Sequence, residues 1–546
     1  MKGRLPVLPL FLLYCVWTSA SGSAAGSAPR TPHHIPACGA PVSARDLQEP
    51  PDIEVWKLPV DAGGERELIL SVHRDGPRFC YRYVWNGGVQ TIAPAIRVHR
   101  GEHFALRIVN DITTQSKGER VASTTLPKCI PAAMPMTEGS LNQYVGYLNH
   151  PLDDRYMKTK PIDTNIHLHG FEGPADQENI FLSTLSTPMH ACEYHITIPR
   201  SQPPGTYFYH PHVHGASFQQ VAFGLSGAWI VEPDTEQIPR SAEHLILLRY
   251  RMPPRFDNPY APDETAIGNA AAAHEGALRF ERPVAYAPFD PPPWPVTYPT
   301  KAGDVSLDAS GCDGMASESF ISVNGSDTPA SLDVPVGATQ LMRIVNATSD
   351  SPKLLKLSDS HGRAVQLRVV ARDGIPVSGD AEHPLAQYIP MASLLISPSA
   401  RADILLTATP GQTLTLSSGH FCEGKDAFYQ MHHDLLRIRA VASAGAHAFA
   451  VSSSPVHTTD TSAARLVAFA RAHSSRIRRR AITFTEYQLP KLGKIPQRDA
   501  YFITDTTNPN FREHPFWPEY RTGGTVPSNA DIVVKAGSIE EWYLIN

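Results

Sequence analysis

The chain has 546 residues, of which 42% are hydrophobic and 18% charged, and its formal net charge is −5. This composition is typical of a globular protein rather than of a disordered one. The small negative charge gives no basis for binding nucleic acid or an anionic membrane surface. At roughly 150 residues per domain, the length predicts three or four domains.

Residues 1–24 have the composition of a secretory signal peptide. A basic start, MKGR, precedes the apolar stretch LPVLPLFLLYCVW and the small-residue stretch TSASGSAAGSA. The apolar stretch is too short for a membrane span, so this order predicts a cleaved signal. The sequence has no other long apolar run. We therefore expect an exported, soluble protein, periplasmic or extracellular, with no membrane span.

Three stretches of the chain resemble one another. In each, a Gly is followed nine residues later by an Asn, and the first two stretches come after an Asn-Gly turn and a Pro. The alternation around the Gly predicts a strand, a turn and a second strand. Because the copies lie about 200 residues apart, the repeating unit is a whole domain. The stretches are PAIRVHRGEHFALRIVN (94–110), PASLDVPVGATQLMRIVN (329–346) and DIVVKAGSIEEWYLIN (531–546).

The repeat predicts an all-β protein of three related β-sandwich domains. The 50 prolines and 37 glycines also favour strands and long loops over helices. The predicted units are a first domain at 50–235 with an insertion at 112–160, a second domain at 236–445 with a Pro-rich insertion at 255–319, a linker at 446–480, and a partial third domain at 481–546.

Two His-x-His pairs lie in the first domain. TNIHLHG carries His167 and His169, and GTYFYHPHVHG carries His210 and His212, followed by His214. Residues two apart in a strand face the same side, roughly 6–7 Å apart, so each pair can serve one metal ion or two neighbouring ions. Imidazole suits copper, zinc, iron or nickel. A single pair could equally be polar residues of a half-buried strand, but two pairs predict a metal site, with His214 in a supporting or packing role.

Six cysteines remain after the predicted signal is removed. An even number in an exported protein predicts disulfides, whose pairing the sequence leaves open. None of the six lies in a Cys-x-x-Cys motif, which disfavours a zinc knuckle. They are Cys38, Cys80, Cys129, Cys192, Cys312 and Cys422.

The segments HLHG and PPGTYFYHPHVHGASFQQVAFGLSGAWIVEP resemble the first copper-binding domain of the multicopper oxidases, in particular the bacterial laccase-like members with HPHxHG. The three-domain repeat resembles the same family, whose domains are Greek-key cupredoxin sandwiches, over roughly residues 80–546 outside the insertions. The resemblance implies a trinuclear copper cluster. In it, His167 would bind the type 2 copper, and His169, His210 and His212 the type 3 pair.

The resemblance also bears on the second domain and on a carboxylate. The middle domain of most members has no copper ligands, and PKLLKLSDSHGR here offers Leu355 and Leu357 where the first copy has its His-x-His pair. A carboxylate after the first HxHG often assists proton delivery in the family. HGFEGPADQENIF offers Asp176 for this proton relay and Glu178 as its rival, with an ordinary loop acid as the alternative reading.

The family needs a further site, a type 1 copper held by one Cys and two His, with His-Cys-His in the third domain. The sequence has no Cys between two histidines. HACEYH (190–195) and HFC (420–422) come nearest, and we expect Cys192 to be buried or in a disulfide. Pro211 disfavours a two-domain nitrite reductase, which has Cys there. The third copy stops at Asn546, so we expect that roughly half of a cupredoxin domain is missing.

We therefore expect an enzyme of the multicopper oxidase family. It would couple one-electron oxidation of a phenolic, amine or metal-ion reductant to reduction of dioxygen to water. The alternative is an inactive copper-binding fragment or an incomplete gene model without the type 1 site. If nothing follows Asn546, neither a blue absorption band nor oxidase turnover is expected. A metal-dependent hydrolase on a (β/α)₈ barrel is disfavoured, because the sequence shows no alternation of strands and helices.

Overall fold

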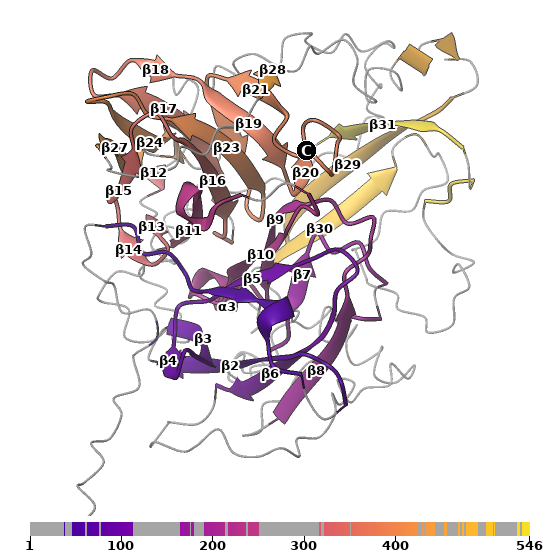
Figure 1. Cartoon of the computed structure of the whole chain (residues 1–546). Helices are drawn as coiled ribbons and strands as arrows, with labels where there is room; N and C mark the ends of the chain where they lie inside the picture. Colours follow the sequence, from indigo (N-terminus) through magenta and orange to yellow (C-terminus); the bar gives the residue numbers. More distant parts are fainter. Residues whose placement is uncertain are drawn as a thin grey trace, which may run out of the picture. The chain divides into compact units, whose positions relative to one another are not determined.

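The computed structural model describes most of residues 46–112, 164–250, 316–442 and 532–545, together with Cys38, 453–455, 477–489, 498–505 and a few isolated residues. All of them belong to one unit, residues 37–546. Their regular structure is almost entirely β, which confirms the predicted all-β class (Figure 1). No helix among these residues is long and apolar enough to cross a membrane. Outside the described residues lie the predicted signal at 1–24, residues 113–160 and 255–315 of the predicted insertions, and His214.

Two five-stranded sheets make up the first sandwich. The first contains, in spatial order, β1 (Asp52–Glu54), β5 (Ala95–Val98), β10 (Gly227–Val231), β9 (Gly205–His210) and β7 (His167–His169). The second contains β4 (Gly88–Gln90), β3 (Arg78–Trp85), β2 (Glu67–Asp75), β6 (His103–Asp111) and β8 (His190–Thr197). The described residues also include short helical elements. These are the 3₁₀ helices Val55–Lys57 and Arg240–Ala242 and the helix α3 (Ser217–Ala222).

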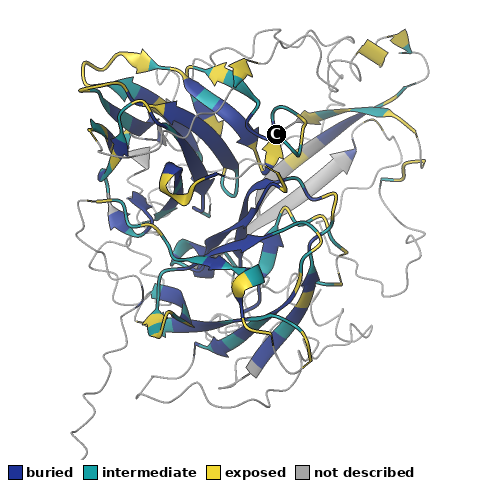
Figure 2. Cartoon of the chain, viewed as in Figure 1, coloured by how far each residue is buried: buried dark blue, intermediate teal, exposed yellow. Residues whose placement is uncertain are grey.

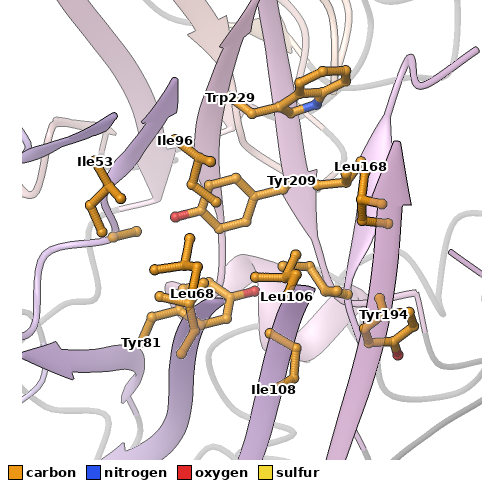
Figure 3. Close-up of a cluster of buried hydrophobic side chains, with 14 of the residues drawn as sticks. Ile53, Leu68, Tyr81, Ile96, Leu106, Ile108, Leu168, Tyr194, Tyr209 and Trp229 are labelled. Carbon is orange, nitrogen blue, oxygen red and sulfur yellow. The ribbon is translucent and has the colours of Figure 1, made fainter. Parts of the chain in front are cut away.

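The facing sides of these two sheets form one hydrophobic core. Tyr209 and Trp229 from the first sheet lie in the same buried cluster as Leu68, Tyr81 and Leu106 from the second (Figure 3). The dark blue of buried residues follows the middle of the strands (Figure 2). At about 25 cal/mol per Å² of buried apolar surface, aromatic side chains of this size are the largest single contributors to such a core.

The second sandwich repeats the strand order of the first. In the first sandwich, β9 lies between β7 and β10, and β10 pairs in parallel with β5. In the second, β24 lies in the same way between β17 and β27, and β27 pairs in parallel with β15. One sheet contains β15 (Ala330–Pro335), β27 (His433–Val441), β24 (Thr413–Gly419), β17 (Lys353–Asp359), β18 (Ala364–Val365) and β22 (Leu394–Ile396). The other contains β14 (Ser326–Asp327), β13 (Ile321–Val323), β11 (Glu243–Tyr250), β16 (Thr339–Asn346), β23 (Arg401–Thr407), β19 (Leu367–Arg372), β20 (Ile375–Pro376), β21 (Gln387–Met391) and β28 (Ser454–Pro455). A small sheet contains β12 (Ala316–Ser317), β26 (Tyr429–Gln430) and β25 (Phe421–Cys422).

A three-strand unit occurs three times in the chain. Among the described strands, a central strand pairs antiparallel with one later strand and parallel with another that comes after it, in the orders β3-β2-β6, β13-β11-β16 and β30-β29-β31. The third copy contains β29 (Arg478–Leu489), β30 (Arg498–Asp505) and β31 (Glu540–Ile545). The later strand of each unit, β6, β16 or β31, comes from one of the three similar stretches. The structure thus bears out the repeat at the level of strand pairing, while the boundaries of the three predicted domains stay predictions.

The turns of the first two copies also match. Gly101 and Gly337 have φ of 82° and 75°, a left-handed conformation that glycine adopts without steric cost. The Asn-Gly turns join β3 to β4 and β13 to β14, and both Asn86 and Asn324 have positive φ, as the two-residue hairpin turn requires. In the third copy Gly537 lies outside the described residues, and Trp542 and Leu544 on β31 are 42% and 62% exposed.

The first and second sandwiches share a buried boundary. Phe208 on β9 and Ile230 on β10 belong to the same hydrophobic cluster as Leu245 on β11 and Val345 on β16. Beside this cluster, buried Arg343 contacts Glu243, and its Nη1 lies 2.8 Å from Oδ2 of Asp403. Burial alone would raise the pKa of Glu243, but Arg343 and Arg97 lower it to about 2. The carboxylate is therefore ionised and depends on its arginine partners.

We predict that Arg343→Met strongly destabilises the protein. The substitution removes the ion-pair partner of buried Asp403, while Glu243 keeps Arg97 and Arg240. Removal of one partner of a buried pair typically costs about 3–5 kcal/mol, whereas an exposed ion pair contributes little. Chemical denaturation measures the change. The matched control is Arg439→Met, which removes an exposed pair with Asp333 and should leave the transition nearly unchanged. Equal losses in the two variants would contradict the prediction.

Candidate metal centre

Cross-strand register brings the two His-x-His pairs together. β7 pairs antiparallel with β9, and His167 lies directly opposite His210. Side chains that oppose one another across two strands lie on the same face of the sheet, and so do residues two apart in one strand. His167, His169 and His210 therefore share one face. His212 follows two residues after His210, just beyond the end of β9.

The four imidazoles are close enough to share metal ions. One ring nitrogen from each of His167, His169 and His210 lies within 4.8 Å of the others. The ring centre of His212 lies 5.2 Å from that of His167 and 5.9 Å from that of His210. Nδ1 of His169 is 3.4 Å from Nε2 of His210. The structure thus assembles all four histidines that the sequence singled out.

Two of these rings are oriented by a hydrogen bond to their other nitrogen. Nδ1 of His167 lies 3.1 Å from Oε1 of Glu178, and Nδ1 of His210 lies 2.8 Å from the carbonyl oxygen of Pro211. An imidazole that donates its Nδ1–H in this way keeps its Nε2 lone pair for a metal ion. Glu178 also accepts a 2.5 Å hydrogen bond from the backbone N–H of Leu168, which fixes its carboxylate.

Burial keeps two of the imidazoles neutral. It lowers the pKa of His169 to about 4, with a further contribution from the positive charge of Arg401. It lowers the pKa of His210 to about 3, with a further contribution from His167. Both rings are therefore unprotonated at neutral pH, so their lone pairs are available, as metal ligation requires.

The walls of the site come from the same strands. Phe208 stacks on His210, with ring centres 4.7 Å apart. Gly170 follows the first pair with φ of 87°, and a Cβ there would lie 2.7 Å from the ring of Tyr207, so no larger residue fits. On its other side His169 lines an open hollow of about 500 Å³, together with Arg372 and other residues of the second sandwich. Of the four clustered histidines, His169 is the one that lines this hollow.

The predicted proton-relay residues lie at different depths. Asp176, the predicted relay, is exposed. Its rival Glu178 is 9% exposed and contacts His167. Both assignments stay predictions, and the geometry favours Glu178 as the residue next to the cluster.

In the second sandwich, leucines lie where the first sandwich has a His-x-His pair, as the sequence indicates. Leu355 lies opposite Ser418 in the β17–β24 pair, which corresponds to the β7–β9 pair, and Leu355 and Leu357 are buried in the core. Cys192 is buried and disulfide-bonded, as expected. A second disulfide joins Cys38 to Cys80.

Sequence reasoning missed two supporting side chains. It considered Glu178 only as a proton carrier, whereas the structure shows it holding the His167 ring. It did not consider Asn165, whose side-chain oxygen accepts a 2.6 Å hydrogen bond from the backbone N–H of His212. Asn165 lies two residues before His167, so the same period of two could have placed it on the metal-facing side of the chain.

Residues 158–236 match the sequence profile of the multicopper oxidases. This range contains all four clustered histidines and Glu178. Within these residues, the chain resembles the multicopper oxidases. The resemblance depends on this match and on the positions of the four histidines within it.

Several multicopper oxidases of known structure are similar to the chain. McoA from the hyperthermophile Aquifex aeolicus is 16% identical, with 81% of this chain and 72% of that chain covered and a TM-score of 0.45. A metallo-oxidase from Campylobacter jejuni is 15% identical, with coverages of 84% and 69% and a TM-score of 0.45. A laccase from Pediococcus acidilactici is 13% identical, with coverages of 82% and 71% and a TM-score of 0.43. No curated protein matches the sequence significantly.

The donor set fits copper. Neutral imidazoles are favourable ligands for copper, and late first-row metals bind such sites in an order that peaks at Cu²⁺. The hydrogen bonds of His167 and His210 leave their Nε2 atoms as donors, and three ring nitrogens already converge within metal-bridging distance. The residues whose donor chemistry fits copper are thus His167, His169, His210 and His212.

We predict that Glu178→Ala weakens copper binding by about 10–100-fold, the usual effect of losing a hydrogen-bond partner of a ligating imidazole. Glu178→Gln should weaken it less, because an amide oxygen can still accept the hydrogen bond from His167. Competition with a copper chelator measures the affinity, and thermal unfolding checks the fold. Asp176→Ala is the matched control and should bind copper like the wild type; an equal loss there would refute the assigned role of Glu178.

Proposed function

We propose that the chain is a multicopper oxidase and that it holds part of a trinuclear copper centre at His167, His169, His210 and His212. The observation that supports the proposal is the convergence of two strand-borne His-x-His pairs on one face of a sheet. His167 would serve the type 2 copper and the other three histidines the type 3 pair. No residue of the described structure or of the printed sequence is assigned to a type 1 copper.

The proposed reaction is the one-electron oxidation of a phenolic, amine or metal-ion reductant, coupled to reduction of dioxygen to water. Bound copper would supply the electron transfer and the dioxygen chemistry. The protein's part is to orient and to shield. Glu178 and the Pro211 carbonyl fix two rings, and Phe208 covers one of them. Hydrogen bonds of this kind orient ligating imidazoles.

The proposal also covers the route of dioxygen and protons to the cluster and the export of the protein. Dioxygen would reach the cluster through the hollow that His169 lines. Glu178 would pass protons to this region in place of Asp176, and its contact with His167, compared with the exposure of Asp176, supports this choice. We also propose that the protein works outside the cytoplasm, on the basis of the signal-like sequence at residues 1–24.

Copper analysis of the purified full chain tests the site. We predict that the wild type binds copper and that His167→Gln with His210→Gln loses at least one equivalent, because each substitution removes a converging nitrogen. His361→Gln, in an exposed turn, is the matched control and should keep the full amount. Circular dichroism checks that the variants fold. If the double variant keeps as much copper as the control, the four histidines are not the ligands.

Assay of dioxygen uptake with a phenolic dye then separates the oxidase from the copper-binding alternative. Turnover that is lost in the double variant supports the oxidase. Copper binding without turnover supports an inactive copper-binding fragment, the alternative reading of the sequence.

A further inference from the structure

We propose that Glu65, His103 and His195 form a second metal site, separate from the copper cluster and open to solvent, for a divalent late transition metal such as Zn²⁺. One ligand atom from each of these residues lies within 4.8 Å of the others. None of them belongs to the histidine cluster described above, and the proposal does not depend on the oxidase activity.

The register of one sheet creates this arrangement. His103 lies opposite Thr197, and His195 lies two residues before Thr197 on the same strand, so both imidazoles project from one face. β2 runs parallel to β6 on the other side, with Glu67 level with Ala105. Glu65 precedes β2 by two residues and so lies beside His103.

Both rings point at one carboxylate oxygen. Nε2 of His103 lies 2.8 Å from Oε1 of Glu65, and Nδ1 of His195 lies 3.0 Å from the same atom. The two rings are nearly parallel, at an interplanar angle of 14° and a centre-to-centre distance of 6.4 Å. The two nitrogens therefore converge on one point from neighbouring strands.

The other nitrogen of each ring also has a polar neighbour. Nδ1 of His103 lies 2.9 Å from Oγ1 of Thr197, and Nε2 of His195 lies 3.3 Å from Oε1 of Glu193. Arg107 holds Glu193 in turn. This is the pattern of ligating histidines, which donate one N–H to an acceptor and bind the metal through the other nitrogen.

The carboxylates around His195 favour a cation at this site. Its two nitrogens each face a carboxylate, Glu65 on one side and Glu193 on the other. A neutral imidazole has only one N–H, so one of its nitrogens turns a lone pair toward a carboxylate. A metal ion between Nδ1 of His195 and the Glu65 carboxylate would bind both atoms and so remove the repulsion between the lone pair and the carboxylate. The Nε2–H of His195 would then donate a hydrogen bond to Glu193. The alternative without metal is a hydrogen-bonded cluster of the three side chains.

The donor set selects the class of metal. Two imidazoles and one carboxylate are the ligands of many zinc sites that keep a position open for water. The harder Mg²⁺ and Ca²⁺ prefer oxygen ligands only. The side chains of His103 and His195 are 52% and 56% exposed, which leaves room for water to complete the coordination. Cu²⁺ would use the same three atoms.

Zn²⁺ titration of the full chain against a chromophoric chelator tests the proposal. The titration is done in a His169→Gln background, which weakens the competing cluster. We predict one bound equivalent that His103→Gln or His195→Gln weakens by at least tenfold. Glu193→Gln should weaken it about tenfold. The matched control is His244→Gln, since His244 also contacts a glutamate, Glu49, but stands outside the triad and should leave the binding unchanged.

The outcomes are distinct. If His195→Gln binds Zn²⁺ like His244→Gln, the triad is a hydrogen-bonded ion cluster only and the proposal is wrong. Both histidines are more than half exposed, so their substitution should not unfold the protein, and circular dichroism verifies this. Copper binding by the His167 cluster is measured separately in His103→Gln and should be unchanged. Loss of Zn²⁺ binding at the triad and loss of copper binding at the His167 cluster can therefore be told apart.

Discussion

Strand β9 is buried on both faces, and the alternation of its side chains places most of the features described above. Tyr207 and Tyr209 point into the core of the first sandwich. Thr206, Phe208 and His210 point to the opposite face. Because the side-chain period of a strand is two, a shift of one residue would put His210 into the core and a tyrosine at the metal site.

The outward face of β9 also ties the metal centre to the neighbouring sandwich. Thr206 donates a 2.6 Å hydrogen bond to Asp403, which is one of the buried partners of Arg343. Phe208, two residues on, packs in the boundary cluster and stacks on His210. The buried ion network and the hydrophobic boundary therefore hold β9 in one register. Their loss would disturb the position of His210 as well as the stability of the fold.

The sequence was sufficient for features that depend on local spacing. The period of two in HLHG placed His167 and His169 on one side of a strand, and the Gly-to-Asn repeat predicted similar strand units. In HPH the strand ends at His210, so the spacing predicted the closeness of His212 but not its position beyond the strand. Features that depend on register between distant segments could not be predicted. The positions of Glu178 against His167 and of Glu65 between His103 and His195 depend on which strands become neighbours. A carboxylate's neighbours cannot be inferred from its position in the sequence alone.

The two sandwiches show that the same strand pairing can occur with or without a cluster of histidines. The β7–β9 and β17–β24 pairs occupy corresponding places in their sheets, with His167 opposite His210 in one and Leu355 opposite Ser418 in the other. Leucine at these positions packs in the core of its own sandwich. Histidine there requires neutral rings, oriented nitrogens and an opening to solvent, which the first sandwich supplies through Glu178, Pro211 and the hollow beside His169. The same strand pairing thus supports either a core or a ligand set, and the side chains around it decide which.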